Sequence, residues 1–485
     1  MEPRFRRVLL TTPPVLADQG ALRPNMGLGY IAQVLKNNNI QYDVLDMMIG
    51  YSLDDLKAKI DTFKPDILGM NIFSNKYKTA YKTLEDVKRY YPSIPIIVGG
   101  PHVSCIKKQV LEGCSAIDYA VVREGEETVL ELCNGEDLKK IKGLYYREGD
   151  GICFNGFRES NNDLDTIPFP TFSKFEIDKY LDERALSSSR GCPYSCVYCA
   201  VGTAIGKKMR VRSAENVVDE IEYWYKHGCR QFSFQDDNFN FYKERVLKIC
   251  DELARRGLDN LFLRCAGARA DKLDVNVLTR MKNVGFKTIA IGVEVGNDKM
   301  LKAIKKGEKF EDIDKAVKTA CDLGYDVYLN FLVGSPQETL EDLKDTARFA
   351  LKYPVFHADF SNIIPYPGTE LYDWLEKNNY LLEKPEVYLN DNSTYSNVPV
   401  FETPELPVET RKKQLIYFKG VRKKILRRAF VRTLNARGIP WGLSHFIGYV
   451  TSLDLVSKYL FHPKVRKLAD KIRFDFYMKQ PDRCA

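Results

Sequence analysis

Three cysteines stand close together in the sequence: Cys192, Cys196 and Cys199 are separated by three and then by two residues. Thiolates spaced in this way on one short loop could hold three corners of an iron–sulfur cluster. Zinc is the competing metal, but structural zinc needs four closed ligands, usually as two separated pairs. No second pair follows directly in the sequence. Three cysteines without a fourth therefore favour a cluster with one iron left open to a substrate or cofactor.

An aromatic residue, Tyr198, directly precedes the third cysteine and gives the pattern C-x3-C-x-aromatic-C. Here the chain resembles the radical S-adenosylmethionine (SAM) superfamily, whose signature has this form. The resemblance implies that Cys192, Cys196 and Cys199 hold a 4Fe-4S cluster whose open iron is chelated by SAM. It also implies an external one-electron reductant, such as flavodoxin or ferredoxin. The reduced cluster would cleave SAM to methionine and a 5′-deoxyadenosyl radical, which abstracts a substrate hydrogen.

These cysteines need a scaffold, and the strand–helix alternation of residues 185–380 predicts one. Six strand-like segments alternate with helical patterns such as Ala214–Tyr225 and Tyr242–Arg255. Six right-handed βα units predict a (βα)6 partial barrel whose working face is the carboxyl end of its strands. The expected strands are Leu186–Ser189, Gln231–Gln235, Phe262–Ala266, Thr288–Val293, Val327–Val333 and Ala358–Ile364.

Short motifs follow these strands, and the resemblance extends to them. Asp236 and Asp237 are similar to the family's D-D-N-F element, where one of them would face the SAM ammonium; helix capping is the alternative. Glu294 lies in a G-V-E-x-G element and would contact polar groups of SAM, unless it forms a structural ion pair. Val295 stands where the family has a small polar residue, so one expected contact is missing. The resemblance implies further SAM contacts from Tyr198, Arg269, Gly334 and Pro365.

Residues 1–140 show the same alternation and predict a Rossmann-like, doubly wound parallel sheet. The expected strands are Arg7–Thr12, Tyr42–Leu45, Ile67–Ile72, Ile94–Val98 and Tyr119–Val122. Such sheets bind ligands in the loops at the carboxyl ends of their strands, although ordinary turn chemistry would also explain the loop residues. The candidate ligand contacts are Thr12, Pro13, Asn71, Ser74, Gly99, Gly100, His102, Glu124, Gly125 and Glu126.

This first region resembles the cobalamin-binding domain found in class B radical SAM enzymes. The D-x-H-x-x-G motif, which supplies a histidine ligand to cobalt in other cobalamin proteins, is absent. His102 follows two glycines and is not expected to bind cobalt. The resemblance therefore implies a cobalamin without a histidine below the metal, as in class B methylases that methylate unactivated carbon or phosphorus. Some members with such a domain catalyse ring formation or carbon–carbon coupling of lipids instead.

The remaining regions are a linker, residues 141–184, with a possible hairpin at Tyr145–Phe154, and a mainly helical C-terminal domain, residues 381–485. The formal net charge is +8, but residues 411–485 contain 19 Lys and Arg against 4 Asp and Glu. The preceding 410 residues carry 54 against 61. The basic, aromatic tail could be a solvated helix face packed on the body, or it could contact anionic lipid; nucleic acid is less expected.

Composition and targeting signals agree with an intracellular enzyme. The N-terminus leads into a strand without an apolar signal region, and no stretch approaches ~20 apolar residues. The other nine of the twelve cysteines are isolated, so we expect a reducing compartment with buried free thiols rather than disulfides. The sequence thus predicts a cytoplasmic protein, with peripheral membrane contact as a further hypothesis.

Together these patterns predict a cobalamin-dependent radical SAM methyltransferase that acts on an unactivated carbon. The first alternative is an enzyme of the same architecture that catalyses cyclisation, oxidation or carbon–carbon coupling without methyl transfer. The second is a non-enzymatic iron–sulfur protein that binds membrane or nucleic acid through its tail. The substrate, a small molecule, lipid or peptide, is not specified by the sequence.

Overall fold

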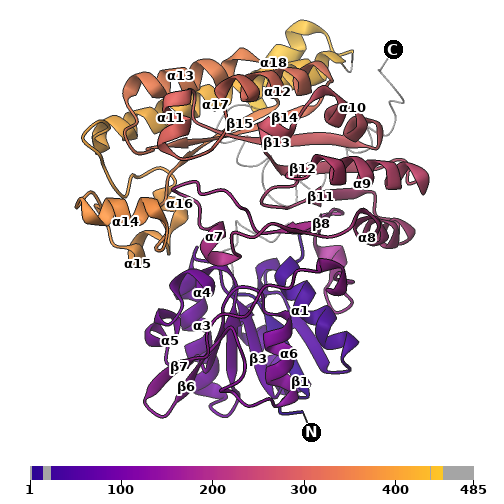
Figure 1. The fold of residues 1–485 in the computed structure, drawn as a ribbon, viewed down its shortest axis with the longest axis vertical. Coiled ribbons are helices and arrows are strands. Elements are labelled where there is room, and N and C mark those ends of the chain that lie inside the picture. Colours follow the sequence, from indigo (N-terminus) through magenta and orange to yellow (C-terminus); the bar gives the residue numbers. More distant parts are fainter. Residues whose placement is uncertain (1–2, 15–22, 437, 452–485) are drawn as a thin grey trace.

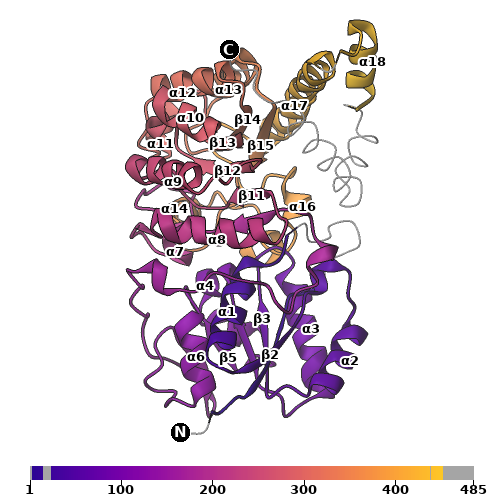
Figure 2. The ribbon, with the colours of Figure 1, turned by 90° about the vertical axis from the view of Figure 1, so that its right-hand side faces the viewer.

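The computed structural model describes residues 3–14, 23–436 and 438–451. A domain built on a seven-stranded sheet lies at one end of the molecule, and a six-stranded sheet covered by helices lies above it (Figure 1). Two further helices, α17 (Val408–Ala436) and α18 (Trp441–Thr451), pack beside the second sheet, with α18 farthest from the first domain (Figure 2). This is the mixed α/β architecture with a helical C-terminal region that the sequence predicts.

The first sheet has the strand order β2-β1-β3-β4-β5-β6-β7. Its first five strands are parallel, whereas β6 and β7 form an antiparallel hairpin at one edge. The strand order reverses beside β1, so the loops after β1 and β3 diverge and leave room for a ligand. The strands are β1 (Arg7–Thr11), β2 (Gln41–Leu45), β3 (Ile67–Asn71), β4 (Ile96–Gly99), β5 (Tyr119–Val121), β6 (Leu144–Glu148) and β7 (Gly151–Phe154).

Helices cover this sheet, as a doubly wound parallel sheet requires. The first helix begins where the Asn25 side chain accepts a hydrogen bond from the Leu28 amide. The same Asn25 oxygen also accepts from the Asn71 amide group, so the helix start is tied to the end of β3. The helices are α1 (Met26–Asn37), α2 (Leu53–Phe63), α3 (Tyr77–Tyr90), α4 (Pro101–Ile106), α5 (Gln109–Gly113) and α6 (Glu126–Asn134).

The segment predicted as a linker follows a different course from the one expected. The hairpin at Tyr145–Phe154 is present, but it extends the first sheet, which therefore reaches beyond residue 140. The chain that follows runs along the first domain: Thr171 donates its amide hydrogen to Gln33, and the Tyr180 hydroxyl donates to Asp46. Two short 3-10 helices, Leu164–Thr166 and Ile177–Lys179, interrupt this stretch, and another two cover Met47–Ile49 and Ala270–Lys272.

The second sheet contains six parallel strands in the order β15-β14-β13-β12-β11-β8. Consecutive strands are neighbours, and the two edge strands β8 and β15 are not paired, so the barrel is partial. The first strand is shorter than predicted, because the chain leaves the sheet after Leu186 and forms a separate antiparallel pair, β9 with β10. The strands are β8 (Arg184–Leu186), β9 (Ser189–Arg190), β10 (Arg210–Val211), β11 (Gln231–Phe234), β12 (Phe262–Ala268), β13 (Phe286–Glu294), β14 (Asp326–Val333) and β15 (His357–Asn362).

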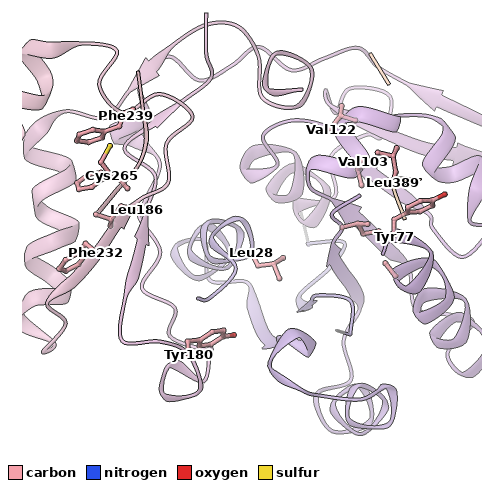
Figure 3. Close-up of a cluster of buried hydrophobic side chains, with 14 of the residues drawn as sticks. Leu28, Tyr77, Val103, Val122, Tyr180, Leu186, Phe232, Phe239, Cys265 and Leu389 are labelled. Atoms are coloured by element: carbon pink, nitrogen blue, oxygen red, sulfur yellow. The ribbon is translucent and has the colours of Figure 1, made fainter. Parts of the chain in front are cut away.

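Amphipathic helices separate these strands and cover the outside of the barrel (Figure 1). They are α7 (Val201–Ala204), α8 (Ala214–Lys226), α9 (Lys243–Arg255), α10 (Val275–Asn283), α11 (Asp298–Ala303), α12 (Phe310–Asp322) and α13 (Leu340–Lys352), followed by α14 (Glu370–Lys377), α15 (Pro385–Tyr388) and α16 (Asn392–Tyr395). Both domains have apolar cores. Figure 3 shows Phe232, Phe239 and Cys265 packed in the barrel, while Leu28 and Tyr77 belong to the first domain.

The long helix α17 covers the open edge of the barrel. Its Phe418 is 1% exposed and stacks on Phe360 of β15, with ring centroids 4.4 Å apart. Arg411, which the charge pattern assigned to a basic surface, is instead 1% exposed and donates hydrogen bonds to the carbonyl groups of Val333 and Ile363. These contacts join α17 to the ends of β14 and β15. The helix therefore replaces a neighbouring strand at this edge.

The Phe418→Ala substitution is expected to lower the free energy of unfolding by about 3 kcal/mol, because it removes a buried ring and leaves a cavity. The neighbouring Tyr417 is 50% exposed on the same helix, so Tyr417→Ala is the matched control and should change stability by less than ~0.5 kcal/mol. Urea unfolding followed by tryptophan fluorescence measures both. Equal effects of the two substitutions would contradict the packing of α17 described above.

Candidate active site

The cysteine loop follows β9 and is held in place by backbone hydrogen bonds. The amide of Cys192 donates to the Gly206 carbonyl (3.3 Å), and the amide of Val197 donates to the Ile304 carbonyl (3.1 Å). Gly191 opens the loop with φ +84°, and a Cβ atom there would lie 2.4 Å from the Lys208 carbonyl oxygen. Only glycine fits this position. The loop is therefore fixed at the carboxyl end of the first barrel strand.

The three cysteines share one environment. Each is partly exposed, in contrast to the buried Cys250 and Cys265 of the barrel core. Burial, together with the charges of Cys196 and Cys192, raises the pKa of Cys199 to about 11, so the three thiols interact electrostatically. Burial also raises the pKa of Cys196. The thiols of Cys196 and Cys199 thus stay protonated at neutral pH until a metal group displaces the protons.

A structural zinc site would need further ligands beside the three cysteines. Within the described residues, no group of three or more His, Cys, Asp or Glu side chains, the three cysteines included, is placed to hold a metal ion. His227 and Cys229 are a downstream pair that the sequence argument overlooked. However, the Cys229 sulfur is buried against the Gln231 carbonyl, and Nδ1 of His227 hydrogen-bonds the Tyr223 carbonyl. Three thiols on one loop, with no fourth, are the donor set of an iron–sulfur cluster with one open iron.

Buried charges surround the cysteine loop. The guanidinium of Arg269 lies 3.5 Å from the ring centre of Tyr194 and donates to the carbonyl groups of Lys306 and Gly307. The Lys306 ammonium lies 3.1 Å from Glu294, which also hydrogen-bonds Tyr198. Burial raises the pKa of Tyr198 well above its usual value, and the Glu294 charge adds to this shift. Arg269 therefore anchors the loop, while Glu294 and Lys306 form a buried pair beside it.

The two aspartates after β11 have different surroundings. Asp236 is buried and accepts hydrogen bonds from the hydroxyl groups of Ser188 (3.1 Å) and Ser189 (2.5 Å). Asp237 is exposed and faces a cavity, where partial desolvation together with the Asp236 charge raises its pKa to about 6. Asp236 thus braces the strand ends, whereas Asp237 presents its carboxylate to the cavity.

The two remaining candidates at the barrel strand ends have structural surroundings. Gly334 has φ +100°, and a Cβ atom there would collide with the Arg411 guanidinium at 2.0 Å. The carbonyl of Pro365 accepts a hydrogen bond from the Tyr388 hydroxyl (2.7 Å). Glu338 accepts hydrogen bonds from the amides of Gly334 and Ser335, and burial raises its pKa to about 7. Gly334 and Glu338 therefore lie next to Arg411 of α17, whereas Pro365 contacts α15.

A cavity of about 300 Å³ lies between the two domains. The ends of β3 and β4 and the turn before α6 line it from the first domain, through Asn71, Gly99, Gly100 and residues 124–126. Arg190, Gln235 and Asp237 line it from the barrel. The loops at the carboxyl ends of both sheets therefore face one shared cavity that is partly open to solvent.

Arg190 joins the two sides of this cavity. Its guanidinium donates to Glu124 (2.9 Å) and Glu126 (2.7 Å), and it lies over the Tyr30 ring at 4.8 Å. Arg210 adds a second hydrogen bond to Glu124 (2.7 Å). Burial favours a higher pKa for Glu126, but the Arg190 charge outweighs it and the pKa is lowered. The sequence analysis missed Arg190, and its position two residues before Cys192 is the signal that could have identified it.

Not every predicted loop residue of the first domain reaches the cavity. Thr12 is buried and donates to Asp46 (2.6 Å), and Pro13 is half-buried outside the cavity lining. His102 is 1% exposed, and its two ring nitrogens pair with Ser74 and Tyr81, each at 3.2 Å. Ser74 and His102 therefore form part of the domain core and lie apart from the cavity.

The cavity has the character that a cobalamin requires. It extends between the sheet and helices α1 and α6 as an apolar slot, lined by Leu10, Gly69, Ile97, Val121 and Leu132. Gly100 has φ +106° at its mouth, and at Gly99 a Cβ atom would meet no atom closer than 3.8 Å. A slot of this kind accepts a flat aromatic group, and a glycine mouth lets a bulky ring approach the backbone. No histidine lines the cavity among the described residues.

Comparisons with known proteins agree with this geometry. Residues 186–350 match the model of the Radical SAM superfamily, and residues 14–133 match the B12 binding domain. The chain is 31% identical over 392 residues to an uncharacterized methyltransferase of Pyrococcus horikoshii, covering 78% of this chain and 85% of the relative. It is 28% identical over 370 residues to the anaerobic magnesium-protoporphyrin IX monomethyl ester cyclase of Rubrivivax gelatinosus, covering 73% and 66%.

Among solved structures, the cobalamin-dependent SAM radical enzyme OxsB superimposes with a TM-score of 0.70 at 19% identity, covering 99% of this chain and 76% of OxsB. The chain therefore belongs to the radical SAM superfamily, and within it to the members that carry a B12-binding domain. It is a radical SAM enzyme of the methyltransferase-like group, and its cofactors are a 4Fe-4S cluster, SAM and cobalamin.

The structure predicts that His102 makes the protein less stable as the pH falls. Burial lowers the pKa of its imidazole from 6.5 to about 4, so between these values the unfolded chain binds a proton that the folded chain does not. Above pH 6.5 the imidazole is neutral in both states and contributes nothing. The expected loss between pH 7 and about pH 5 is about 2 kcal/mol. His102→Gln should flatten this part of the stability profile, whereas replacing the exposed His227 by Gln should leave the profile unchanged.

The Cys196→Ala variant is expected to lose the cluster, because two thiolates on the loop cannot hold it. Iron content after anaerobic reconstitution should fall to background, and 5′-deoxyadenosine should no longer form from SAM. The control is Cys250→Ala, since Cys250 is buried on α9 away from the loop. A full iron content in the Cys196 variant would refute the assignment of the cysteine loop.

Proposed function

We propose that this enzyme transfers a methyl group to an unactivated carbon of its substrate, using SAM and cobalamin. The observation that supports this is the shared cavity: the cysteine loop begins two residues after Arg190, which lines the cavity opposite the glycine mouth of the first domain. A substrate held there would meet groups bound on both sides.

The proposed roles follow the geometry. Cys192, Cys196 and Cys199 hold the cluster, and the Asp237 carboxylate faces the cavity, where it would attract the SAM ammonium. When bound, the cluster and SAM supply a hydrogen-abstracting radical, and cobalamin supplies the methyl group. Asn71, Gly99, Gly100 and residues 124–126 line the space for cobalamin.

Other predicted site residues receive structural roles in this proposal. Asp236, Arg269, Gly334 and Pro365 hold the strand ends and the cysteine loop through the contacts described above. Glu294 and Tyr198 would lie next to the cluster as a half-buried hydrogen-bonded pair. A radical must be shielded from side reactions with water. In this proposal the Arg190 contacts, which hold the two domains together, keep water out of the cavity.

A second candidate is radical chemistry without methyl transfer. The similarity to a cyclase supports it, since that relative matches 73% of this chain. In this case cobalamin would bind in the same cavity, but SAM would be consumed only through radical formation. The ratio of two SAM products therefore distinguishes the candidates.

The wild-type enzyme, purified anaerobically with cobalamin and given SAM and a flavodoxin reducing system, is expected to form S-adenosylhomocysteine as well as 5′-deoxyadenosine. Gly99→Leu places a side chain in the cavity, because a Cβ atom at Gly99 meets nothing within 3.8 Å. This variant should lose about tenfold or more of its corrinoid and its S-adenosylhomocysteine product while keeping the cluster and 5′-deoxyadenosine.

The control for that substitution is Gly420→Leu on α17, where an added Cβ atom meets no atom within 4 Å. It should match the wild type in corrinoid, iron and both products. If the wild type carries stoichiometric corrinoid but yields 5′-deoxyadenosine alone, methyl transfer is refuted and the cyclase-like candidate stands.

A further inference from the structure

Helix α18 has an unusual composition for a surface helix. Its eleven residues include no Lys, Arg, Asp or Glu, yet Trp441 is 70% and Phe446 is 65% exposed. Leu443 and Tyr449 are also more than half exposed on the same helix. A helix facing water normally presents charged side chains there, so a contiguous apolar face marks an interaction surface.

The neighbouring helix supplies positive charge. Helix α17 carries ten Lys and Arg against one Glu. Some of these cations contact the barrel and are not available to a partner. Arg411 is buried. Arg428 and Arg432 donate hydrogen bonds to the carbonyl groups of Leu351 and Pro354, respectively. Others, including Lys413, Lys424 and Arg427, lie on the exposed side of α17 together with Ile416 and Tyr417.

The two helices present these groups on one outward surface. Gly448 of α18 packs on Val431 and Arg427 of α17, and the Arg427 guanidinium lies 5.3 Å from the Tyr449 ring centre. Val431 and Arg427 continue the stripe formed by Lys413, Ile416 and Lys424, at three- and four-residue spacing. Helix α18 therefore lies on the side of α17 that faces away from the barrel (Figure 2).

We propose that this outer surface of α17 and α18 docks on the surface of an anionic lipid bilayer. Exposed Trp, Phe, Leu and Tyr side chains suit the headgroup boundary, and flanking Lys and Arg side chains attract anionic headgroups. A soluble acidic protein would match the charge but would leave the charge-free α18 face without an apolar counterpart. None of the described helices is long and apolar enough to cross a membrane.

This surface is separate from the cavity between the domains, and the docking does not depend on which reaction the enzyme catalyses. Binding to vesicles and the yield of SAM products can thus be measured on the same preparation. If vesicle binding is not observed, the SAM products still test the proposed reaction, and the reverse also holds.

The test uses the full chain with its cluster and sedimentation with vesicles of phosphatidylcholine containing about 30% phosphatidylglycerol, against vesicles of phosphatidylcholine alone. The wild type is expected to bind the anionic vesicles and to lose binding as salt is raised. Trp441→Ser combined with Phe446→Ser should weaken binding about tenfold or more. Lys424→Glu combined with Arg427→Glu should weaken it by a similar factor and flatten the salt dependence.

The matched control combines Tyr90→Ser with Val275→Ser, which removes two hydrophobic side chains of comparable exposure, 57% and 62%, from other faces. It should bind vesicles as the wild type does. A Trp441→Phe variant should keep its affinity and lose the blue shift of tryptophan emission that vesicles produce. Iron content and circular dichroism confirm that each variant is folded.

Two results would overturn the proposal. One is a wild type that does not sediment with anionic vesicles at low salt, or a Trp441/Phe446 variant that binds as well as the wild type. The other is light scattering that shows a dimer in solution which the same variant converts to a monomer, because a second copy of the chain would then cover this surface.

Discussion

The contact of Arg190 with Glu124 and Glu126 is the interaction on which the arrangement of the site depends. It lies where the turn before α6 of the first domain meets the start of the cysteine loop. All three side chains are largely buried, at 12–17% exposure. Ions removed from water are stable only when their hydrogen-bonding groups are paired, and here one guanidinium is shared between two carboxylates. Any displacement of one domain would leave a buried charge unpaired, so the pair fixes the domains face to face.

Other buried cations are also paired with groups that hold parts of the site in place. Arg269 binds backbone carbonyl groups that flank the cysteine loop, Lys306 pairs with Glu294, and Arg411 binds carbonyl groups at the ends of β14 and β15. Each of these cations fastens a loop or an edge at the carboxyl end of the barrel strands. The strand ends of a partial barrel lack the mutual support of a closed one, and these contacts replace it.

Much of this fold could be predicted from the sequence, because alternating strand and helix patterns report on burial. The strands of both sheets appear close to their predicted bounds, and the cysteine spacing located the loop. The pattern could not show which polar residues turn inward. Asp236 and Asp237 are neighbours of the same type, yet one is bound by Ser188 and Ser189 while the other faces the cavity. Likewise, Arg411 is one of three consecutive basic residues, and its burial arises from contacts with strands about 50 to 80 residues earlier.

The difference between Asp236 and Asp237 has a chemical consequence. An anionic group whose hydrogen bonds are all satisfied by the protein has little capacity left for a ligand. Asp237 is exposed at the cavity and has a pKa of about 6, so it is mostly ionised at neutral pH. Partial desolvation and the neighbouring Asp236 charge disfavour this ionised state, and a bound cation would offset both effects. Burial and two serine hydroxyl groups make Asp236 a brace for the strand ends, whereas the exposed Asp237 is the carboxylate of the pair that would be open to a positively charged ligand in the cavity.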